Sequence, residues 1–364
     1  MTLIHVIIPV YNAKKYLQKT VDSILKQPCS SNIDILLIDD GSNDGSEILC
    51  DELQKQNANV YILHQKNSGV SCARNVGIDF YKDKEDGWIC FLDADDLWNE
   101  NVFDDKMCDY IKAQEEADVL VFGGSTSNEE ESRFSLPRMY EPAIINGGNS
   151  VIWKMQGHFC ANLYRLSMLR KWNIRFSEGL KYSEDKIFMM QSGFLASKVE
   201  FMPQLLHIYR QNAKSAMGIS RKISAIEYYI PIIEGWVASD MFLNILESKT
   251  NKSTDAGIVL AGIYFGDMAR EHYKNWGSAK ELEKVKQHPY YYLYETMNPN
   301  CVTKKQYNDC KLFRFHPILY KAKYNAIGIL EYFVKCLLFL KPVYKYRNLK
   351  KYPLNREQFI ERVK

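Results

Sequence analysis

The sequence predicts an α/β protein with a mostly parallel sheet flanked by helices. The first 125 residues alternate between short apolar runs and segments whose apolar residues recur at helical spacing. Three of the apolar runs end directly in polar clusters, as parallel strands do when their carboxyl ends line a binding edge. Strands connected through helices form right-handed βαβ units, so both faces of the sheet should be covered.

The strands and helices of this region follow from their patterns. The strands are short apolar runs, which suit buried parallel strands: Ile4–Val10, Ile33–Ile38, Val60–Leu63, Trp88–Leu92 and Val119–Phe122. The helices have an apolar stripe at helical spacing: Ala13–Gln27, Asn43–Gln56, Ser71–Phe80 and Val102–Gln114.

The remaining chain is less regular. Residues 124–150 are rich in Ser, Asn, Glu and Gly and indicate a loop or small insertion. Residues 152–211 mix helices with strands, in this order: a helix near Ile152–Met155, a strand near Leu163, helices near Ser167–Trp172 and Glu184–Ala196, and a strand over Val199–Tyr209. Beyond about residue 220 the pattern is helical and rich in aromatic residues. We therefore expect a first domain over residues 1–220 and a helical, basic region over 221–364.

The net charge of +3 hides an asymmetry along the 364 residues. Residues 301–364 carry 15 Lys and Arg against 4 Asp and Glu, a net charge of +11. The preceding 300 residues carry 32 Lys and Arg against 40 Asp and Glu, a net charge of −8. A basic tail of this kind indicates an anionic partner, either a membrane surface or a polyanion.

The cysteines and apolar runs indicate the compartment. Nine cysteines, an odd number without C-x-x-C spacing, favour free thiols in a reducing environment. The chain opens directly into a strand-like run and lacks the pattern of a signal peptide. No run reaches 18 uninterrupted apolar residues, so no membrane span is expected. We expect a cytoplasmic protein, with attachment to the inner face of the membrane left open.

The acidic cluster Asp93-Ala94-Asp95-Asp96 follows a buried strand directly. Desolvation and mutual repulsion both oppose three unpaired carboxylates at such a place. A hard divalent cation relieves this, because Mg²⁺ and Mn²⁺ bind carboxylate oxygens and can then hold a phosphate. Asp93, Asp95 and Asp96 are therefore candidate metal ligands. The alternative is an acidic cluster that only favours the dipole of a following helix.

Two further strands end in polar residues that should meet the acidic cluster at one edge of the sheet. The first ends in Pro9-Val10-Tyr11-Asn12 and the second in Asp39-Asp40-Gly41-Ser42. Judged alone, the second segment could be only a turn, with Ser42 or Asn43 capping the next helix. The expected convergence of three clusters favours a binding site.

Four segments, in order and at matching spacing, resemble glycosyltransferase family 2, whose members are inverting enzymes with the GT-A fold. They are Ile7–Asn12 (IIPVYN), Ile38–Ser46 (IDDGSNDGS), Asn67–Gly77 (NSGVSCARNVG) and Phe91–Asp96 (FLDADD). The resemblance spans roughly residues 1–215. It implies a GT-A fold, a nucleotide-sugar donor and a divalent metal ion, Mn²⁺ or Mg²⁺.

The resemblance also implies a role for each matching residue. The donor would be bound by Pro9, Tyr11, Asp39, Asp40, Ala73, Arg74, Asn75, Asp93, Ala94 and Arg210. Asp40 would accept a hydrogen bond from a uracil-type ring N–H, since an ionised carboxylate is only an acceptor. Arg74 would direct its forked donors at the diphosphate, unless it is merely a solvated helix residue. Asp95 would hold the metal ion, with Asp96 an equal candidate.

Inversion requires a base that takes the proton from the attacking acceptor hydroxyl. Glu184-Asp185 resembles the Glu-Asp segment of the family, which makes Asp185 the candidate base. Alternatively, Ser183 caps a helix and the two acidic residues only favour its first turn. Downstream, the segment from His207 to Arg210 resembles the closing segment of the family, where His207 could bind metal or be structural.

Together these observations predict a metal-dependent inverting glycosyltransferase. Residues 1–125 would bind a UDP-sugar, and residues 126–220 would face a glycan or lipid-linked glycan acceptor of cell-surface polysaccharide synthesis. A nucleotidyltransferase is less favoured because it usually opens with a glycine-rich loop, which is absent here. A non-catalytic sugar-nucleotide-binding scaffold is less favoured because Asp185 stands in its Glu-Asp context.

The basic, aromatic segment 324–352 suggests a further partner. It is too short to span a bilayer but suits an amphipathic segment lying on an anionic membrane. It could equally pack as a helix against the catalytic domain or a partner subunit, so homo-oligomer formation stays open. No nucleic-acid-binding module is visible in the sequence, and we expect no nucleic-acid partner.

Overall fold

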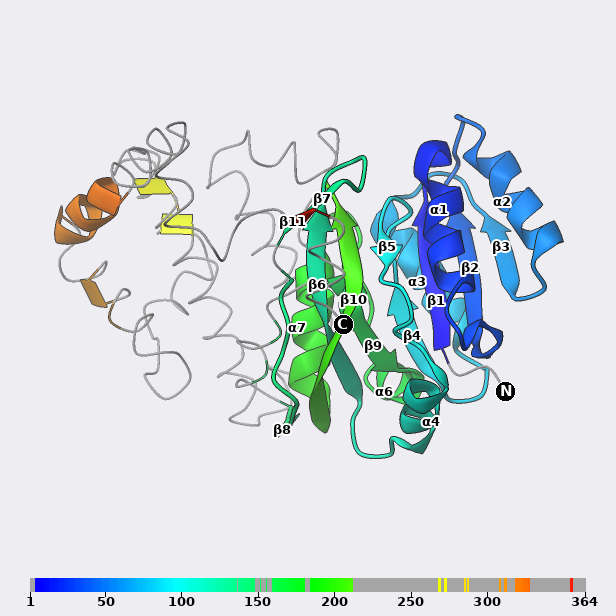
Figure 1. Ribbon diagram of the computed structural model, residues 1–364. Coiled ribbons are helices and arrows are strands. Elements are labelled where there is room, and N and C mark those ends of the chain that lie inside the picture. The colour runs from blue at the N-terminus through cyan, green and yellow to red at the C-terminus, as the bar shows by residue number, and fades with distance from the viewer. Residues whose placement is uncertain are drawn as a thin grey trace. The chain divides into compact units, whose positions relative to one another are not determined.

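The computed structural model of the protein divides the chain into two compact units (Figure 1). Unit 1 contains Met1–Gly179, Ser183–Asn212 and Tyr352–Lys364, and unit 2 contains Leu180–Tyr182 and Ala213–Lys351. The structure describes residues 4–135, 137–147, 151, 155, 159–180, 184–211, 268–269, 272–273, 285, 287, 308, 311–312, 318–327 and 354–355. The expected domain boundary near residue 220 stays a prediction.

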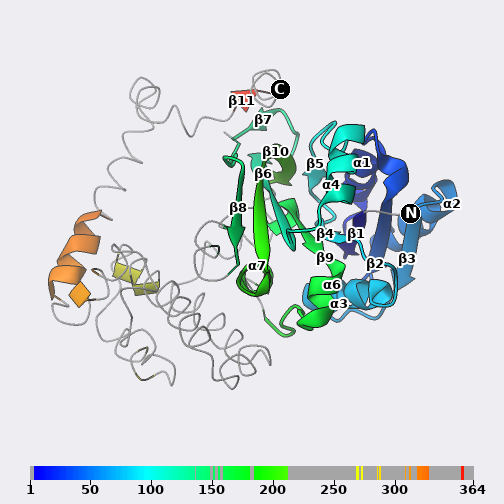
Figure 2. The ribbon, with the colours of Figure 1, turned by 90° about the horizontal axis from the view of Figure 1, so that it is seen from below.

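The first half of unit 1 is the expected parallel sheet. Its strands, in spatial order, are β4 (Trp88–Phe91), β1 (Ile4–Val10), β2 (Ile33–Asp39) and β3 (Val60–His64), and all three pairings are parallel. The connecting helices are α1 (Lys14–Leu25), α2 (Ser46–Gln56), α3 (Val70–Tyr81) and α4 (Asp105–Ala113). Figure 2 shows α1 and α4 on one side of the strands and α3 on the other. This double covering explains why β1 and β2 are apolar along almost their whole length.

The second half of the sheet is mixed, unlike the mostly parallel arrangement that strand–helix alternation suggested. β9 (Asn162–Arg165) is inserted between β4 and β6 (Val119–Ser127) and runs antiparallel to both. β10 (Lys198–Arg210) then pairs in parallel with β6. The other strands, all in antiparallel pairs, are β5 (Leu97–Trp98), β7 (Arg133–Phe134), β8 (Ala143–Asn146) and β11 (Leu354–Asn355). Two further helices, α6 (Leu166–Lys171) and α7 (Glu184–Leu195), complete the described part of this unit.

Residues 124–150, expected to be a loop or small insertion, contain strands. β6 continues to Ser127, and both β7 and β8 lie in this stretch. Two glycines of β6, Gly123 and Gly124, let this strand lie close to the neighbouring backbone. A Cβ at Gly123 would approach the carbonyl oxygen of Arg138 to 2.5 Å, so only glycine lets these two backbone segments lie so close. The next residue, Gly124, forms the bridge with Arg138.

Helix ends differ from the expected ones by a few residues, and at α4 a side-chain cap sets the start. α4 begins at Asp105 rather than near Val102, since the Asp104 carboxylate accepts a hydrogen bond from the Met107 N–H. The expected helix near Ile152–Met155 and most of the expected helical region 221–364 lie outside the described residues. Short 3₁₀ helices occur at Ser30–Asn32 and Phe159–Ala161.

An aromatic cluster connects β4 to α7. The ring of Phe91, the last residue of β4, stacks on the ring of Phe159 with centroids 5.3 Å apart. The rings of Phe176 and Phe188 stack with centroids 4.1 Å apart. Tyr164 of β9 meets the edge of Phe188 at 5.2 Å. Each such ring pair contributes about 0.5–1.5 kcal/mol beyond the apolar area that it buries. The cluster therefore fixes the start of α7 relative to the end of β4.

The cysteines that the structure describes are free thiols, as the sequence predicted. They are Cys29, Cys50, Cys72, Cys90, Cys108 and Cys160, and all but Cys72 are buried. Burial raises the pKa of Cys50 to about 12, so this thiol stays protonated and unreactive at neutral pH. Among the described helices, none has the length and apolarity that crossing a bilayer requires.

Candidate active site

The three polar clusters predicted from the sequence follow neighbouring strands. β1 lies between β2 and β4, with Val10 opposite Asp39 and Ile7 opposite Phe91. Adjacent strands are about 4.8 Å apart. The chain therefore leaves all three strands at the same edge of the sheet, as expected.

The loops after β1 and β2 are bound to each other. The Asn12 backbone N–H donates to the Ser42 hydroxyl at 3.1 Å, and the Asn43 N–H donates to the Asn12 side-chain oxygen at 2.9 Å. Asn12 adopts a positive φ of 50°, which asparagine tolerates better than most residues. Between these fixed loops the Tyr11 ring is 53% exposed, and Pro9 is partly exposed. Both could therefore border a flat ligand.

The two carboxylates after β2 are buried and bind their own chain. Asp40 accepts hydrogen bonds from the Gln65 amide at 2.7 Å and from the backbone N–H groups of Ser68 and Gly69 at 2.8 and 2.9 Å. Asp39 accepts from the Ser42 N–H at 3.0 Å. Asp40 thus holds the loop that leads into α3, which is more than the turn cap considered as the alternative. An ionised carboxylate has about four acceptor positions, so one remains for a ligand.

The acidic cluster after β4 divides into two kinds of residue. Asp96 is fully buried, and its carboxylate binds the His207 Nε2 at 2.8 Å and accepts from the Arg210 backbone N–H at 2.9 Å. Asp93 and Asp95 are partly exposed. Burial, together with the charges of Asp96 and Asp93, raises the pKa of Asp95 to about 7. Two of the three candidate ligands are therefore partly exposed, while Asp96 is buried and binds His207 and Arg210.

Arg74 is not the solvated helix residue of the alternative interpretation, because it is only 3% exposed. Its Nη2 donates to Asp93 at 2.7 Å and its Nη1 donates to Glu184 at 2.9 Å. The guanidinium also lies 5.2 Å from the Phe159 ring centroid and 5.1 Å from that of Phe176. Burial opposes its charge, but the two carboxylates outweigh burial and raise the pKa of Arg74. Arg74 therefore bridges the acidic cluster and the start of α7.

The neighbours of Arg74 on α3 also face the protein interior. Ala73 is fully buried, and the Asn75 side chain donates to the Phe176 carbonyl at 3.0 Å and accepts from the Phe176 N–H at 2.9 Å. In this structure these residues hold residues 176–178 against α3. Their contact with a donor nucleotide stays a prediction.

Arg210 is also turned inward. Its guanidinium donates to the Asp95 carbonyl and, at 2.9 Å, to the Glu131 carboxylate, and it lies 5.0 Å from the Tyr16 ring centroid. The sequence reasoning missed Glu131, because it lies in the stretch taken as a loop, and saw Tyr16 only as part of an apolar helix face. The predicted reach of Arg210 to a diphosphate stays a prediction.

The residues at the start of α7 have different surroundings. Glu184 is mostly buried against Arg74, and burial together with the charge of Asp185 raises the pKa of Glu184. Asp185 is partly exposed, and its carboxylate accepts the Lys186 N–H at 2.7 Å. Ser183, the alternative cap, lies outside the described residues. Both residues are thus partly exposed, and Glu184 is the one that Arg74 binds.

The described residues contain one cluster with mixed donor atoms. Asp96, Cys160 and His207 offer atoms within 4.8 Å of one another, and all three are buried. Asp96 and His207 already bind each other, and burial raises the pKa of the Cys160 thiol and lowers that of His207 to about 4. Because Mg²⁺ and Mn²⁺ favour oxygen ligands, the partly exposed carboxylates of Asp93 and Asp95 fit such an ion better.

Comparison with known proteins identifies the family. The model for "Glycosyl transferase family 2" matches residues 5–173. The glycosyltransferase GlyG of Streptococcus pneumoniae is 34% identical over 266 residues, which are 68% of this chain and 85% of GlyG. The chain belongs to glycosyltransferase family 2. This family 2 chain is also 26% identical over 255 residues to the minor teichoic acid biosynthesis protein GgaA of Bacillus subtilis, covering 68% of this chain and 54% of GgaA.

Solved structures confirm the GT-A fold of this family 2 protein. TarS residues 1–349 of Staphylococcus aureus, crystallised with UDP-GlcNAc, superimpose with a TM-score of 0.58 at 17% identity over 90% of both chains. The same TarS fragment without ligand gives a TM-score of 0.59 at 16% identity. Family membership and the named relatives confirm the predicted enzyme class, a glycosyltransferase related to transferases of teichoic acid synthesis.

Proposed function

We propose that the protein transfers a sugar from a UDP-sugar, with inversion and with the help of Mg²⁺ or Mn²⁺, to a hydroxyl of a glycan or lipid-linked glycan. The observation that carries the proposal is the buried bridge from Asp93 through Arg74 to Glu184. It joins the strand end expected to hold the diphosphate to the helix start that carries the candidate base.

Two features support a UDP-sugar as donor. The exposed Tyr11 ring and Pro9 stand at the edge where Asp39 and Asp40 fix the neighbouring loop. A uracil ring could stack on Tyr11 and donate its N–H to the remaining acceptor position of Asp40. The structural neighbour TarS is described in complex with UDP-GlcNAc and with UDP.

The proposed metal ligands are Asp95 and Asp93, with Asp96 as a supporting residue. The two outer carboxylates offer the hard oxygen donors that Mg²⁺ and Mn²⁺ bind. Burial and then the charges of Asp96 and Asp93 raise the pKa of Asp95, and a bound cation would offset these negative charges. When bound, the metal ion would stabilise the negative charge of the departing diphosphate. The hydrogen bonds of Asp96 to His207 and Arg210 hold this turn in position.

In the proposed reaction Asp185 takes the proton from the acceptor hydroxyl as its oxygen attacks the anomeric carbon. The bond between that carbon and the diphosphate oxygen breaks, and UDP leaves from the opposite side, which inverts the anomeric centre. Arg74 binds the Glu184 carboxylate, so we assign Glu184 a positioning role beside the base. Residues 1–125 would form the donor half of a catalytic domain 1–220, with 126–220 on the acceptor side and 221–364 as an accessory region.

A panel of UDP-, GDP-, CDP- and dTDP-sugars tests the proposal by the release of nucleotide diphosphate. We expect release from a UDP-sugar only, its loss in EDTA and its recovery with Mn²⁺ or Mg²⁺. Asp185→Asn should bind UDP normally and lower the rate by about 10²–10⁴, the usual contribution of a general base. Asp83→Asn, a change at an exposed acidic residue, is the matched control. A near-normal rate of Asp185→Asn would reject the base, and release that persists in EDTA would reject the metal.

A further inference from the structure

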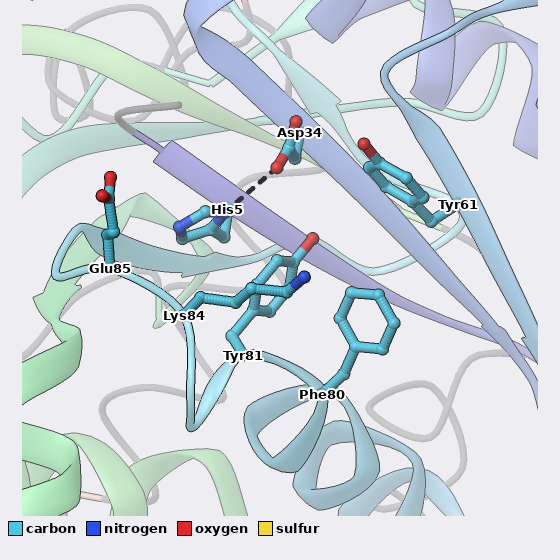
Figure 3. A pocket seen from close by; sticks show the side chains of 7 residues that line it. All are labelled: His5, Asp34, Tyr61, Phe80, Tyr81, Lys84 and Glu85. Atoms are coloured by element: carbon cyan, nitrogen blue, oxygen red, sulfur yellow. Dashed lines mark ion pairs between the residues drawn. The ribbon is translucent and has the colours of Figure 1, made fainter. Parts of the chain in front are cut away.

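A second cavity lies at the end of the parallel sheet where β1 and β2 begin, opposite to the candidate active site. Figure 3 shows the residues that line it. Its volume is about 260 Å³, and its lining residues are His5, Asp34, Tyr61, Phe80, Tyr81, Lys84 and Glu85. His5 is the second residue of β1 and pairs with Asp34 of β2. At about 3.3 Å per strand residue, His5 lies roughly 20 Å from Tyr11. No lining residue takes part in the proposed reaction.

The cavity contains a polar group without a partner. Tyr81 is 1% exposed, and its hydroxyl has no hydrogen-bond partner among the residues that the structure describes. Its ring is held in place by stacking on His5, with centroids 4.2 Å apart, and by the edge of Phe80 at 5.0 Å. Figure 3 shows the hydroxyl directed toward the side of the cavity where Asp34 and Tyr61 lie. A buried hydroxyl normally has a partner, so this one is available to a ligand.

The other walls offer apolar faces and polar groups together. The rings of Tyr61 and Phe80 are 6.2 Å apart at 43°, and Tyr61 is 38% exposed. Asp34 and Glu85 supply carboxylate acceptors, and Lys84 supplies an ammonium donor. A ligand could therefore lay C–H groups on the rings while its hydroxyl groups bind at the margin.

The lining carries charges of both signs. Asp34 lies 3.4 Å from the His5 Nδ1, Glu85 adds a second carboxylate, and the Lys84 ammonium lies 5.7 Å from the centre of the Phe80 ring. A simple cation or anion would therefore meet a charge of its own sign as well as one of opposite sign. The cavity is slightly smaller than the roughly 300–1,000 Å³ of pockets for drug-sized ligands. These properties favour a small, neutral, polyhydroxylated ring.

We propose that this cavity is a second saccharide site, which binds one neutral pyranose residue of a glycan remote from the reacting sugar. The Tyr61 and Phe80 rings hold the C–H face of the sugar. The Tyr81 hydroxyl, Lys84, Asp34 and Glu85 bind its hydroxyl groups. The connection to an acceptor glycan rests on the proposed function, whereas saccharide binding in the cavity does not.

Saturation-transfer NMR and calorimetric titration of the full chain test the proposal. The probes are the methyl β-glycosides of glucose, galactose and N-acetylglucosamine, with choline and inorganic phosphate as charged probes. We expect at least one glycoside to bind and neither charged probe to bind. Tyr61→Ala should weaken binding about tenfold or more, and Tyr81→Phe, which removes one hydrogen bond, about two- to tenfold.

Lys84→Ala provides a variant at an exposed residue that should fold normally, and its matched control is Lys82→Ala two residues away, outside the lining. Weaker glycoside binding in Lys84→Ala with unchanged binding in Lys82→Ala supports the site. The proposal is overturned if no glycoside binds, if choline or phosphate binds instead, or if Tyr61→Ala and Lys84→Ala both keep full affinity. Donor turnover should be unchanged in these variants, so failure of the donor panel would count against the proposed function and not against this cavity.

Discussion

At the scale of single residues, burial decides what an ion pair contributes. Arg74 and Arg175 each donate to an aspartate at 2.7 Å, to Asp93 and Asp79 respectively. Arg74 is 3% exposed, whereas the side chains of Arg175 and Asp79 are 29% and 54% exposed. The Asp93 side chain is 37% exposed, so water screens both pairs, but it screens the second more because only the first contains a fully enclosed charge. The two ion pairs therefore contribute differently to the free energy of unfolding, although their N···O distances are equal.

Arg74→Met tests this difference, because it keeps most of the volume and removes the charge. Asp93 and Glu184 would lose their common partner, so we expect the free energy of unfolding to fall by about 3 kcal/mol, as it does when a buried pair is broken. Arg175→Met should cost less than about 1 kcal/mol. Urea denaturation measures both values, and an equal loss in the two variants would contradict the role of burial.

The ion pair between His64 and Asp39 should make the stability of the protein depend on pH. The hydrogen bond to Asp39, at 2.9 Å, raises the pKa of His64 above its ordinary value of 6.5. Burial raises the pKa of Asp39, but hydrogen bonds from Ser42 and His64 bring it below its ordinary value of 3.8. The contribution of His64 is complete below about pH 6.5 and is lost as the pH rises through its folded pKa. That of Asp39 is complete above about pH 3.8 and is lost as the pH falls through its folded pKa.

The pair should therefore stabilise the protein most between about pH 4 and 6.5. In Asp39→Asn we expect the pKa of His64, followed by NMR of the imidazole protons, to move down toward 6.5. The decline of stability above pH 6.5 should become shallower in this variant. A wild-type His64 that titrates at or below 6.5 would contradict the assignment.

At the scale of elements, α3 supports the site because it packs unusually close to the sheet. A Cβ at Gly77 would lie 2.5 Å from the Ile7 Cγ2 of β1 and 3.0 Å from its Cδ1. The glycine therefore lets α3 approach β1, and this approach brings Arg74 within reach of Asp93. The same helix carries Tyr81 at its other end, in the second cavity.

Gly77→Ala should destabilise the protein by about 1–3 kcal/mol, because overpacking outweighs the gain in helix propensity. Ile7→Ala removes the side chain that the new methyl group would meet. The double variant should therefore be more stable than the sum of the two single changes predicts. Thermal or urea unfolding of the four proteins measures the coupling, and strict additivity would show that the contact is not the cause.

At the scale of the whole molecule, residues near both ends of unit 1 belong to one sheet, with four strands between β11 and β1. β11 pairs with β7 through Leu354 opposite Phe134, so residues near the carboxyl end of the chain return to the sheet that begins at Ile4. The basic segment 324–352 precedes this return and lies almost entirely outside the described residues. Residues 318–327 form a helix. Attachment of the segment to the inner face of a membrane stays a prediction.

A flotation assay tests this attachment. We expect the full chain, with +11 over residues 301–364, to float with liposomes that contain anionic lipid, less so with neutral liposomes, and to detach as salt increases. Replacing Lys341, Lys345, Lys350 and Lys351 by Gln should weaken binding. Equal flotation with neutral and anionic liposomes, or none at all, would contradict the prediction.

The sequence by itself determined the strands of the first half, the edge where their polar ends meet, and the family. Short apolar runs and ordered motifs are local patterns, and the parallel connections that they imply have few alternatives. The sequence did not show that β9 enters the sheet between β4 and β6, because strand pairing depends on segments far apart along the chain.

Only the tertiary structure decided which side chains of the motifs are buried and which are partly exposed. Arg74 and Glu184 lie 110 residues apart, as Asp96 and Arg210 lie 114 apart, and nothing local in the sequence indicates that these groups bind each other. A charged group inside a protein needs a counter-charge or hydrogen bonds, and packing alone determines which distant group supplies them. For this reason the sequence could only propose Asp93–Asp96 and Ala73–Asn75 as site residues, while the fold showed which of them are buried and which distant groups they bind.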